Sequence, residues 1–223
     1  MNDWAIIPVK PLSQAKSRLA TVLTPAERKH LAAELLERTV RLLLSVWEIR
    51  GALVISRDAD VLAMAPKWGA QSIQESGTPE LNSALRLATQ KLSTWNADAV
   101  LVVPEDIPLL TGDDVQQVLS LAREANSVVI VPDRREEGTN LLFMRPPGLI
   151  PYWFGEQSFA EHQRLAREAN AALSMYRSER AALDLDTPDD LRQYRELAKA
   201  LGVPMINAAE FERSLLAGKS HPI

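Results

Sequence analysis

Two aspartates, Asp184 and Asp186, stand one residue apart in the segment Leu183–Thr187. Side chains alternate faces along an extended chain, so the two carboxylates should project from the same side, with Cβ atoms roughly 6–7 Å apart. Carboxylates this close repel, and one takes up a proton unless a cation lies between them. Mg²⁺ suits this position because it takes one or two carboxylates and completes its coordination with water and phosphate oxygens. The pattern predicts a Mg²⁺ site; the alternative is a strand end that faces solvent.

The residues that follow this pair have the pattern of a helix start. Thr187 suits the N-cap, Pro188 suits the first helical position, and Asp190 stands where a capping box places its acidic residue. Asp189 and Asp190 therefore have a structural explanation, which Asp184 and Asp186 lack.

Three cations follow the first predicted strand, Trp4–Val9: Lys10, Lys16 and Arg18. Open α/β folds bind ligands at the carboxyl ends of their strands, which is where these side chains should lie. Lysine can neutralise a phosphate as a point charge, and arginine can bind it with two hydrogen bonds. The alternative is a solvated basic loop.

A third carboxylate is predicted at the end of the most apolar strand, Ala99–Val103. This continuous β-branched run is typical of a central parallel strand covered on both faces. It leads into Pro104–Pro108, where we favour Asp106 as a ligand of the same ion. Glu105 should point to the opposite face if the strand continues that far.

Polar residues at two further helix starts are candidates for substrate contacts. Asn82, at the end of a turn-rich loop, could bind a base or a sugar, although asparagine at a helix start is more often a local cap. Ser158 is the predicted N-cap of a helix over residues 160–170, and with Gly155 nearby this helix start offers backbone N–H groups to an anion. His162, in the first turn, is interpreted as structural.

Apolar runs and periodic segments alternate along the chain and predict one α/β domain over residues 1–223 with a mostly parallel sheet. Residues 141–144 follow the preceding strand too soon for a helical crossover, which predicts one antiparallel strand. The other predicted strands are 52–55, 71–74, 127–131 and 172–176. The other predicted helices are 25–47 with Thr24 as its cap, one ending near 67, one ending near 95, one starting at 111, and two at the carboxyl end.

The composition narrows the class of protein. The 223 residues are 46% hydrophobic, enough for one core, and the net charge of −4 gives no general attraction to nucleic acid or acidic membranes. The chain has no cysteine, which excludes disulfides and thiolate metal sites. The start lacks the pattern of a signal peptide, and no stretch approaches 18 apolar residues. We expect a cytoplasmic protein that binds neither nucleic acid nor membranes; the sequence does not indicate its oligomeric state.

Several separated motifs, taken in order, resemble one family. They are Pro8-Val9-Lys10, Ala15-Lys16-Ser17-Arg18-Leu19, Asp106-Ile107-Pro108-Leu109-Leu110, Gly138-Thr139-Asn140, Phe154-Gly155-Glu156-Gln157-Ser158-Phe159 with His162, and Asp184-Leu185-Asp186-Thr187-Pro188. This arrangement, which covers nearly the whole chain, resembles the phosphoenolpyruvate / 2-phospho-L-lactate guanylyltransferases of coenzyme F-420 biosynthesis. The resemblance implies a nucleotidyltransferase-type, Rossmann-like three-layer α/β sandwich. It also implies transfer of GMP from GTP to a phosphorylated three-carbon acid.

The resemblance assigns roles to specific residues. It implies that Asp106, Asp184 and Asp186 hold Mg²⁺. Thr139, Gly155 and Ser158 would contact the three-carbon acid. Lys10, Lys16 and Arg18 would face the GTP phosphates as catalytic and nucleotide-binding residues, with Asn82 assisting in nucleotide binding.

One departure and several alternatives accompany the resemblance. The family usually has a glycine-rich run before its Gly-Thr-Asn, whereas this chain has Arg135-Glu136-Glu137, whose acidic side chains would disfavour an anion if they pointed inward. The alternatives are a metal-dependent glycosyltransferase that uses Asp184-Leu185-Asp186, another nucleotidyltransferase, and a non-catalytic nucleotide-sensing domain. The acceptor could be phosphoenolpyruvate, 2-phospholactate or 3-phosphoglycerate, which share the same anionic groups.

Overall fold

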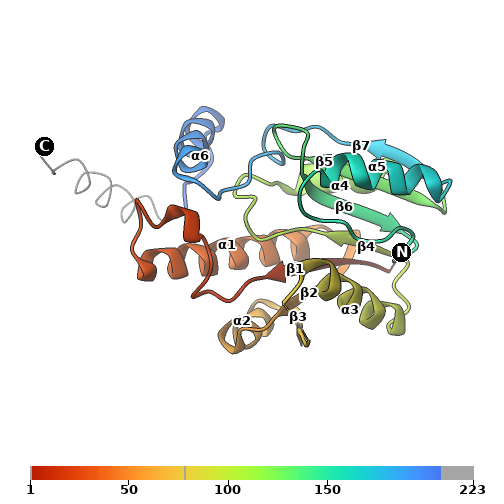
Figure 1. The fold of residues 1–223 in the computed structure, drawn as a ribbon, viewed down its shortest axis with the longest axis horizontal. Coiled ribbons are helices and arrows are strands. Elements are labelled where there is room, and N and C mark those ends of the chain that lie inside the picture. Colours follow the sequence, from red (N-terminus) through yellow and green to blue (C-terminus); the bar gives the residue numbers. More distant parts are fainter. Residues whose placement is uncertain (1, 78, 207–223) are drawn as a thin grey trace, which may run out of the picture.

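The computed structural model describes residues 2–77 and 79–206 of the chain. Within these residues, seven strands form one sheet in the order β3-β2-β1-β4-β6-β5-β7, which Figure 1 shows with β1 near the middle. The strands are β1 (Asp3–Val9), β2 (Ile49–Ser56), β3 (Gln71–Gln74), β4 (Ala99–Val102), β5 (Ser127–Pro132), β6 (Thr139–Arg145) and β7 (Ala172–Met175). The helices are α1 (Pro25–Ser45), α2 (Ala59–Met64), α3 (Leu81–Thr94), α4 (Gly112–Leu121), α5 (Ser158–Glu168) and α6 (Pro188–Leu201), with 3₁₀ turns η1 (Ser17–Leu19) and η2 (Ala65–Trp68).

The prediction of a mostly parallel sheet with one antiparallel strand is confirmed. β6 runs antiparallel to both of its neighbours, β4 and β5, while the other strand pairs are parallel. Val102 at the end of β4 pairs with Leu142 of β6. Since β6 runs the opposite way, its first residue, Thr139, lies beyond the carboxyl end of β4. The antiparallel strand thus brings a polar amino end to the edge where the parallel strands end.

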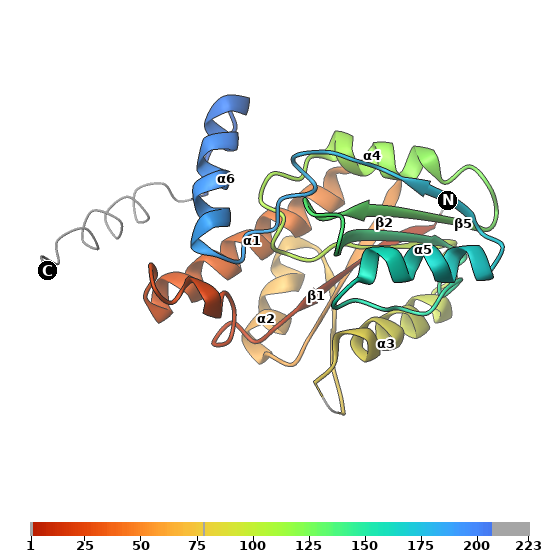
Figure 2. The same ribbon diagram turned by 45° about the horizontal axis from the view of Figure 1, so that its top comes forward.

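Helices cover both faces of the sheet and make three layers. Ala5 and Ile7 of β1 face one core cluster, to which α1, α2 and α4 contribute, while Ile6 faces a second cluster with α3 and α5. This alternation follows from the period of two in a strand, and both sets are apolar because both faces are covered. Figure 2 shows α4 and α3 on opposite sides of the strands.

A third core cluster lies beyond the sheet, between α1 and α6. Leu31 and Leu35 of α1 pack with Leu191 and Tyr194 of α6, and the cluster also takes in η1 and residues 183 and 185. Figure 1 shows α6 standing near the start of α1, apart from the sheet. This packing holds the segment before α6 against the chain that follows β1.

The predicted caps of two helices are confirmed and those of two others are corrected. Thr24 and Thr187 form capping boxes at α1 and α6. α5 begins at Ser158 itself, and its N-cap is Gln157 in a left-handed conformation (φ 57°). The N-cap of α3 is Glu80, whose carboxylate accepts two backbone N–H groups, so Asn82 is not the cap.

The second predicted terminal helix, like the final part of the predicted domain, lies outside the described residues. Among the helices that the structure describes, none is long and apolar enough to cross a membrane.

A buried carboxylate, Asp114 in the first turn of α4, fixes the chain that leads from β7 toward Asp184. Its oxygens accept hydrogen bonds from the Thr111 cap, from Tyr176 Oη and Ser178 Oγ (both 2.8 Å), and from Arg180 Nε and Nη2 (both 3.0 Å). Asp114 itself is fully buried. Burial alone would raise the pKa of Asp114, but these donors lower it to about 2. One carboxylate therefore holds three side chains of the segment that precedes the Asp184–Asp186 pair.

Asp114→Asn should lower the free energy of unfolding at pH 7 by about 3 kcal/mol, as expected when one partner of a buried ion pair is removed. Because the folded-state pKa of Asp114 is depressed, its stabilisation is present above the unfolded-state pKa of about 4 and is lost as the pH falls toward 2. Urea denaturation should show the difference between wild type and variant shrinking from pH 5 to pH 2. Asp113→Asn, exposed in the same turn, is the control. A difference that stays constant with pH would contradict the assignment.

Candidate active site

The candidate site lies at the carboxyl ends of β1 and β4. β1 pairs in parallel with both β2 and β4. After β1 the chain continues to β2 and β3 on one side of the sheet, and after β4 it continues to β5, β6 and β7 on the other side. In open α/β sheets this reversal leaves a crevice in which ligands bind. The cations that follow β1, the acidic residues that follow β4 and the beginning of β6 all meet there.

The centre of the site is the ammonium group of Lys16. Its Nζ lies 3.2 Å from Asp106 Oδ2 and 3.3 Å from Asp186 Oδ1, and only 3% of the side chain is exposed. Burial alone would lower the pKa of Lys16, but the carboxylates of Asp106, Glu105 and Asp186 outweigh that effect and raise it above its ordinary value. The lysine is therefore a fixed positive charge that joins two segments 80 positions apart in sequence.

Asp184 and Asp186 project together, as predicted, because the residues beside them are buried. Leu183 and Leu185 are 1% and 0% exposed and point into the cluster between α1 and α6, which turns the two aspartates to the other side. The segment forms no strand. It is fixed by the Leu185 N–H, which donates to the Asp106 carbonyl over 2.9 Å. This bond aligns the acidic pair with the residue that follows β4.

The condition under which Glu105 should point away from the site, a strand that continues to it, is not met. β4 ends at Val102, so the strand alternation does not reach this residue, and Glu105 is buried close enough to interact with Asp106, Lys16 and Asp186. Burial and the Asp106 carboxylate raise the pKa of Glu105 to about 7, while Lys16 opposes that rise. The two prolines of Pro104–Pro108 are the sequence signal that the strand ends before Glu105.

The acidic residues fit a divalent cation by their charge, although the described residues contain no group of three acidic or histidine side chains already gathered as ligands. The Lys16 ammonium already stands between Asp106 and Asp186, as a cation would. Among the described residues Asp184 has no such partner, and its pKa is raised to about 6 by burial and by the charges of Asp106 and Asp186. The site thus carries more negative charge than its lysine neutralises. Asp106, Asp184 and Asp186 offer the carboxylate oxygens that Mg²⁺ prefers.

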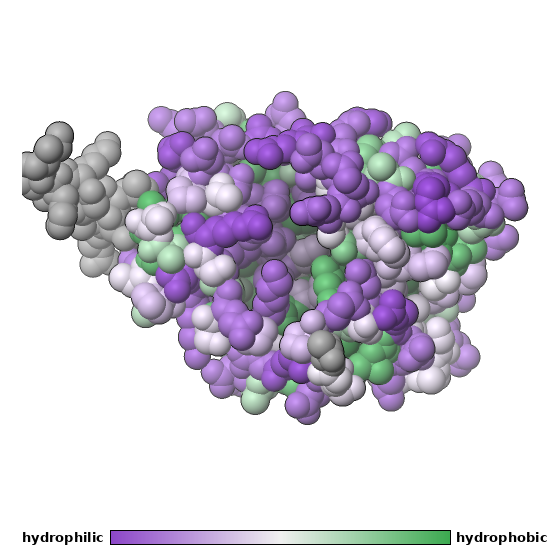
Figure 3. Space-filling model, viewed as in Figure 1, coloured by the Kyte–Doolittle hydropathy of each residue, from purple (hydrophilic) through white to green (hydrophobic). Residues whose placement is uncertain are grey.

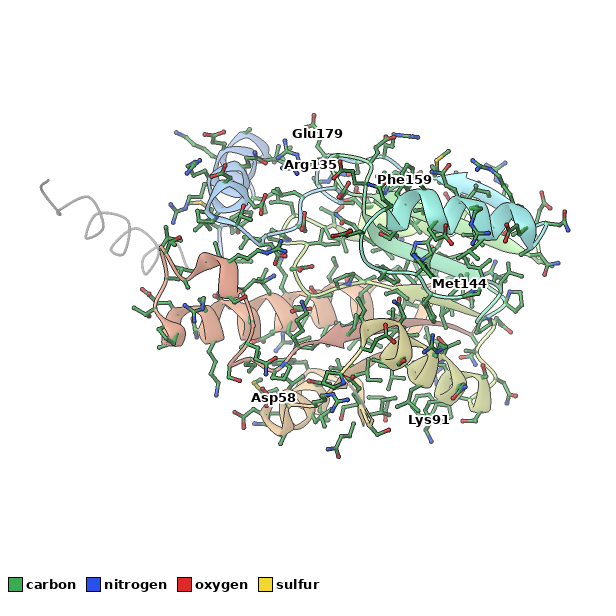
Figure 4. All side chains as sticks on the ribbon, viewed as in Figure 1. Asp58, Lys91, Arg135, Met144, Phe159 and Glu179 are labelled. Atoms are coloured by element: carbon green, nitrogen blue, oxygen red, sulfur yellow. The ribbon has the colours of Figure 1, made fainter. Side chains whose placement is uncertain are left out.

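The other two predicted cations are exposed at the same edge. Arg18 Nη1 lies 3.9 Å from Asp186 Oδ2, and 73% of its side chain is exposed. Lys10 is exposed at the end of β1. The loop between them is held by Asp58, whose carboxylate accepts the Leu12 N–H over 2.8 Å. Figure 4 shows Asp58 near α2 and Phe159 at the start of α5, on opposite sides of the sheet.

Asn82 makes contacts other than those predicted. Its amide nitrogen donates to the Phe154 carbonyl (3.2 Å) and its amide oxygen accepts the Phe154 N–H (2.7 Å). Both ends of the amide are therefore used to join α3 to the segment before α5. The amide nitrogen has a second hydrogen and the oxygen a second lone pair, so contact between Asn82 and the nucleotide stays a prediction; its observed role is to position Phe154.

Thr139 and Ser158, predicted from two motifs 19 residues apart, are in direct contact. The Thr139 N–H donates to Ser158 Oγ over 2.9 Å, so this hydroxyl joins the start of β6 to the first turn of α5 and does not cap the helix. The Phe159 N–H also donates to the Glu137 carbonyl. Gly155 lies before this helix with φ +136°, a conformation that side chains with a Cβ rarely adopt, and the space where a Cβ would stand is open.

His162 lies behind Thr139 and is fully buried. Its Nδ1 lies 2.9 Å from Thr139 Oγ1, and its Nε2 accepts the Trp153 N–H over 3.1 Å. The Phe154 ring meets the imidazole edge-on, with 5.0 Å between ring centroids. Burial lowers the pKa of His162 to about 4, so the ring is neutral at pH 7.

The acidic residues of Arg135-Glu136-Glu137 are exposed. Glu136 is exposed and pairs with Arg177, with 2.6 Å between Glu136 Oε1 and Arg177 Nε, and Glu137 is exposed. Asp133 accepts backbone N–H groups from Arg135 and Glu137 and so shapes the turn. The departure from the family pattern therefore places both acidic side chains in exposed positions, one of them paired with Arg177.

The surface around the site is mainly hydrophilic. Purple residues cover most of the face in Figure 3, and paler and green residues show in the recess near its middle. The structure thus brings Lys16, Arg18, Asp106, Asp184 and Asp186 together in a charged half of the site. Thr139 and Ser158 form a neutral half, joined to the charged half by the Asn140 amide, which donates to the Ala181 carbonyl over 2.9 Å.

Lys16→Met should destabilise the protein more at pH 8 than at pH 5. Without the ammonium, the neighbouring carboxylates repel one another when ionised, and the raised pKa values of Asp184 and Glu105 mean that this repulsion grows as the pH rises through about 6 to 7. Chemical denaturation at the two pH values measures the difference, with Lys10→Met, an exposed cation of the same loop, as the control. Equal destabilisation at both pH values would show that the charge of Lys16 does not hold the acidic residues together.

The comparisons with known proteins agree on one family. The model of the family described as "Guanylyl transferase CofC like" matches residues 3–196. A phosphoenolpyruvate guanylyltransferase of Sphaerobacter thermophilus is 36% identical over 193 residues, which cover 86% of this chain and 92% of that protein. A 2-phospho-L-lactate guanylyltransferase of Methanothermobacter thermautotrophicus is 38% identical over 191 residues, 86% of this chain and 83% of that protein.

A solved structure supports the same fold. A nucleotidyl transferase from Methanothermobacter thermautotrophicus superposes with a TM-score of 0.65 at 14% sequence identity, over 90% of this chain and 99% of that one. The family match spans the sheet, the acidic residues, the basic loop and the start of α5. The chain belongs to the CofC-like guanylyl transferase family.

Proposed function

We propose that this chain transfers GMP from GTP to a phosphorylated three-carbon acid, phosphoenolpyruvate or 2-phospho-L-lactate, and so serves coenzyme F-420 biosynthesis. The observation that carries the proposal is the division of the site. Carboxylates with buried Lys16 form one half, and the neutral hydroxyls of Thr139 and Ser158 form the other. Family membership supports nucleotidyl transfer over glycosyl transfer and over nucleotide sensing without turnover.

The reaction needs little acid–base chemistry. A phosphate oxygen of the acid attacks the α-phosphorus of GTP in line, a new P–O bond forms, and the bond to the departing pyrophosphate breaks. The attacking phosphate is already an anion at neutral pH, so no general base is required. The main barrier is repulsion between two anions, which cations at the site can offset.

Different residues of the chain serve different parts of this reaction. Arg18 and Lys10 are exposed at the edge where the triphosphate would lie, and both can reach phosphate oxygens. Lys16 keeps Asp106 and Asp186 in place. When bound to Asp106, Asp184 and Asp186, Mg²⁺ would neutralise phosphate charge during the transfer. Positioning of the two substrates supplies much of the remaining rate gain.

Asp184→Asn and Asp186→Asn should each lower kcat by at least about 100-fold and leave the fold intact, since the loss of a metal-held interaction in the transition state costs several kcal/mol. Circular dichroism and steady-state kinetics at saturating Mg²⁺ measure the two properties. Asp189→Asn, exposed in the same segment, is the control. Near-wild-type turnover in both site variants would contradict the proposal that Asp184 and Asp186 hold Mg²⁺.

The substrates are tested by pyrophosphate release. GTP or ATP is combined with Mg²⁺ and, in parallel, phosphoenolpyruvate, 2-phospho-L-lactate or 3-phosphoglycerate. We expect one of the first two acids to be used, and kcat/KM for GTP to exceed that for ATP by at least about 100-fold, because a site built to hydrogen-bond one base leaves buried groups unpaired with another. Equal use of ATP and GTP would favour a less specific nucleotidyltransferase. Absence of product with all three acids would contradict the proposed function.

A further inference from the structure

The hydrogen bonds of His162 fix where its proton lies. Nε2 accepts the Trp153 N–H over 3.1 Å, and a backbone N–H can only donate. In a neutral imidazole one nitrogen accepts and the other donates, so the hydrogen must be on Nδ1. The ring is fully buried, which favours this neutral form.

The proton on Nδ1 determines what the Thr139 hydroxyl can do. Nδ1 lies 2.9 Å from Thr139 Oγ1, and since Nδ1 donates, the oxygen accepts and keeps its own hydrogen for another partner. Ser158 Oγ likewise accepts, from the Thr139 N–H. Within the part of the chain that the structure describes, neither hydroxyl donates a hydrogen bond. The hydroxyl hydrogens of Thr139 and Ser158 are therefore both available to donate to another group.

We propose that His162 is a positioning residue that makes the Thr139 hydroxyl a hydrogen-bond donor to the anionic three-carbon acid. A carboxylate or phosphate oxygen only accepts, so it suits a pair of hydroxyls whose acceptor roles are already filled. With the proton on Nε2 instead, the Thr139 hydroxyl would donate to the imidazole and present only lone pairs to the anion. The inference rests on the proposed function, because it assumes that the acid binds in the neutral half of the site.

Two substitutions distinguish the effect of the Nδ1–H donor of His162 from the effect of the volume of its ring. His162→Phe keeps an aromatic ring against Phe154 without a donor, whereas His162→Asn keeps an N–H group near the position of Nδ1. Losing a hydrogen bond to a charged group is commonly worth about a ten- to a hundredfold change in affinity. We expect KM for the acid to rise by about tenfold or more in His162→Phe and by clearly less in His162→Asn. The dissociation constant for GTP, from calorimetry, should stay within about twofold in both.

Adding Thr139→Val tests whether the two residues act as one unit. In wild type this substitution should raise KM for the acid by a similar factor, and in His162→Phe it should add little, as a double-mutant cycle shows for coupled partners. If the two substitutions raised KM for the acid independently, so that their factors multiplied in the double variant, the proposal would be overturned. So would a wild-type KM in His162→Phe, or a rise in KM that is as large in His162→Asn as in His162→Phe.

Nitrogen-15 NMR of the full chain tests the tautomer without substrate. The protein has three histidines, so variants His30→Gln and His221→Gln assign the signals of His162. We expect a protonated Nδ1 and an unprotonated Nε2 at pH 7. A proton on Nε2, or a charged ring, would overturn the inference even if the enzyme transfers GMP as proposed. If wild type uses no three-carbon acid while this tautomer is observed, the proposed function fails and the donor geometry stands.

Discussion

The ammonium of Lys16, buried between Asp106 and Asp186, is the interaction on which the rest of the site depends. A lysine buried without partners would lose its proton, and carboxylates gathered without a cation would gain one. The ammonium and the two carboxylates offset each other's charge at this buried position. The lysine adopts a left-handed backbone conformation, φ 53°, which is uncommon for a residue with a side chain and persists because the surrounding packing holds it. Charge balance therefore links the chain after β1 to the segments before α4 and α6.

The fold keeps two kinds of anion-binding chemistry apart at one edge of the sheet. Parallel strands deliver charged residues there, and antiparallel β6 delivers the start of the neutral half, with Thr139 as its first residue. The neutral half presents the hydroxyl groups of Thr139 and Ser158, which are held by buried partners and carry no charge. Asp114 and Asn140 fix the segment between the halves through Arg180 and the Ala181 carbonyl. The separation of the charged residues from the neutral hydroxyls thus follows from strand direction.

Much of the site could be predicted from local patterns in the sequence. Alternation of Leu183 and Leu185 with Asp184 and Asp186 was enough to place both carboxylates on one side. The same rule does not apply to Glu105, because the chain leaves the strand at Val102, and this buried carboxylate interacts with Asp106. The alternation of side chains between two faces can be used for prediction only within the strand that shows it.

The sequence by itself determined the order of strands and helices, the capped starts of α1 and α6 and the residues that could carry charge, since periodicity and capping depend on neighbours in the chain. Only the tertiary structure decided how the polar groups are paired. Asn82 and Ser158 both looked like cap residues, yet Asn82 binds the backbone of Phe154 and Ser158 accepts from Thr139. The physical reason is that a hydrogen bond requires a donor and an acceptor within about 3 Å, and these partners are brought together from positions 72 and 19 residues apart.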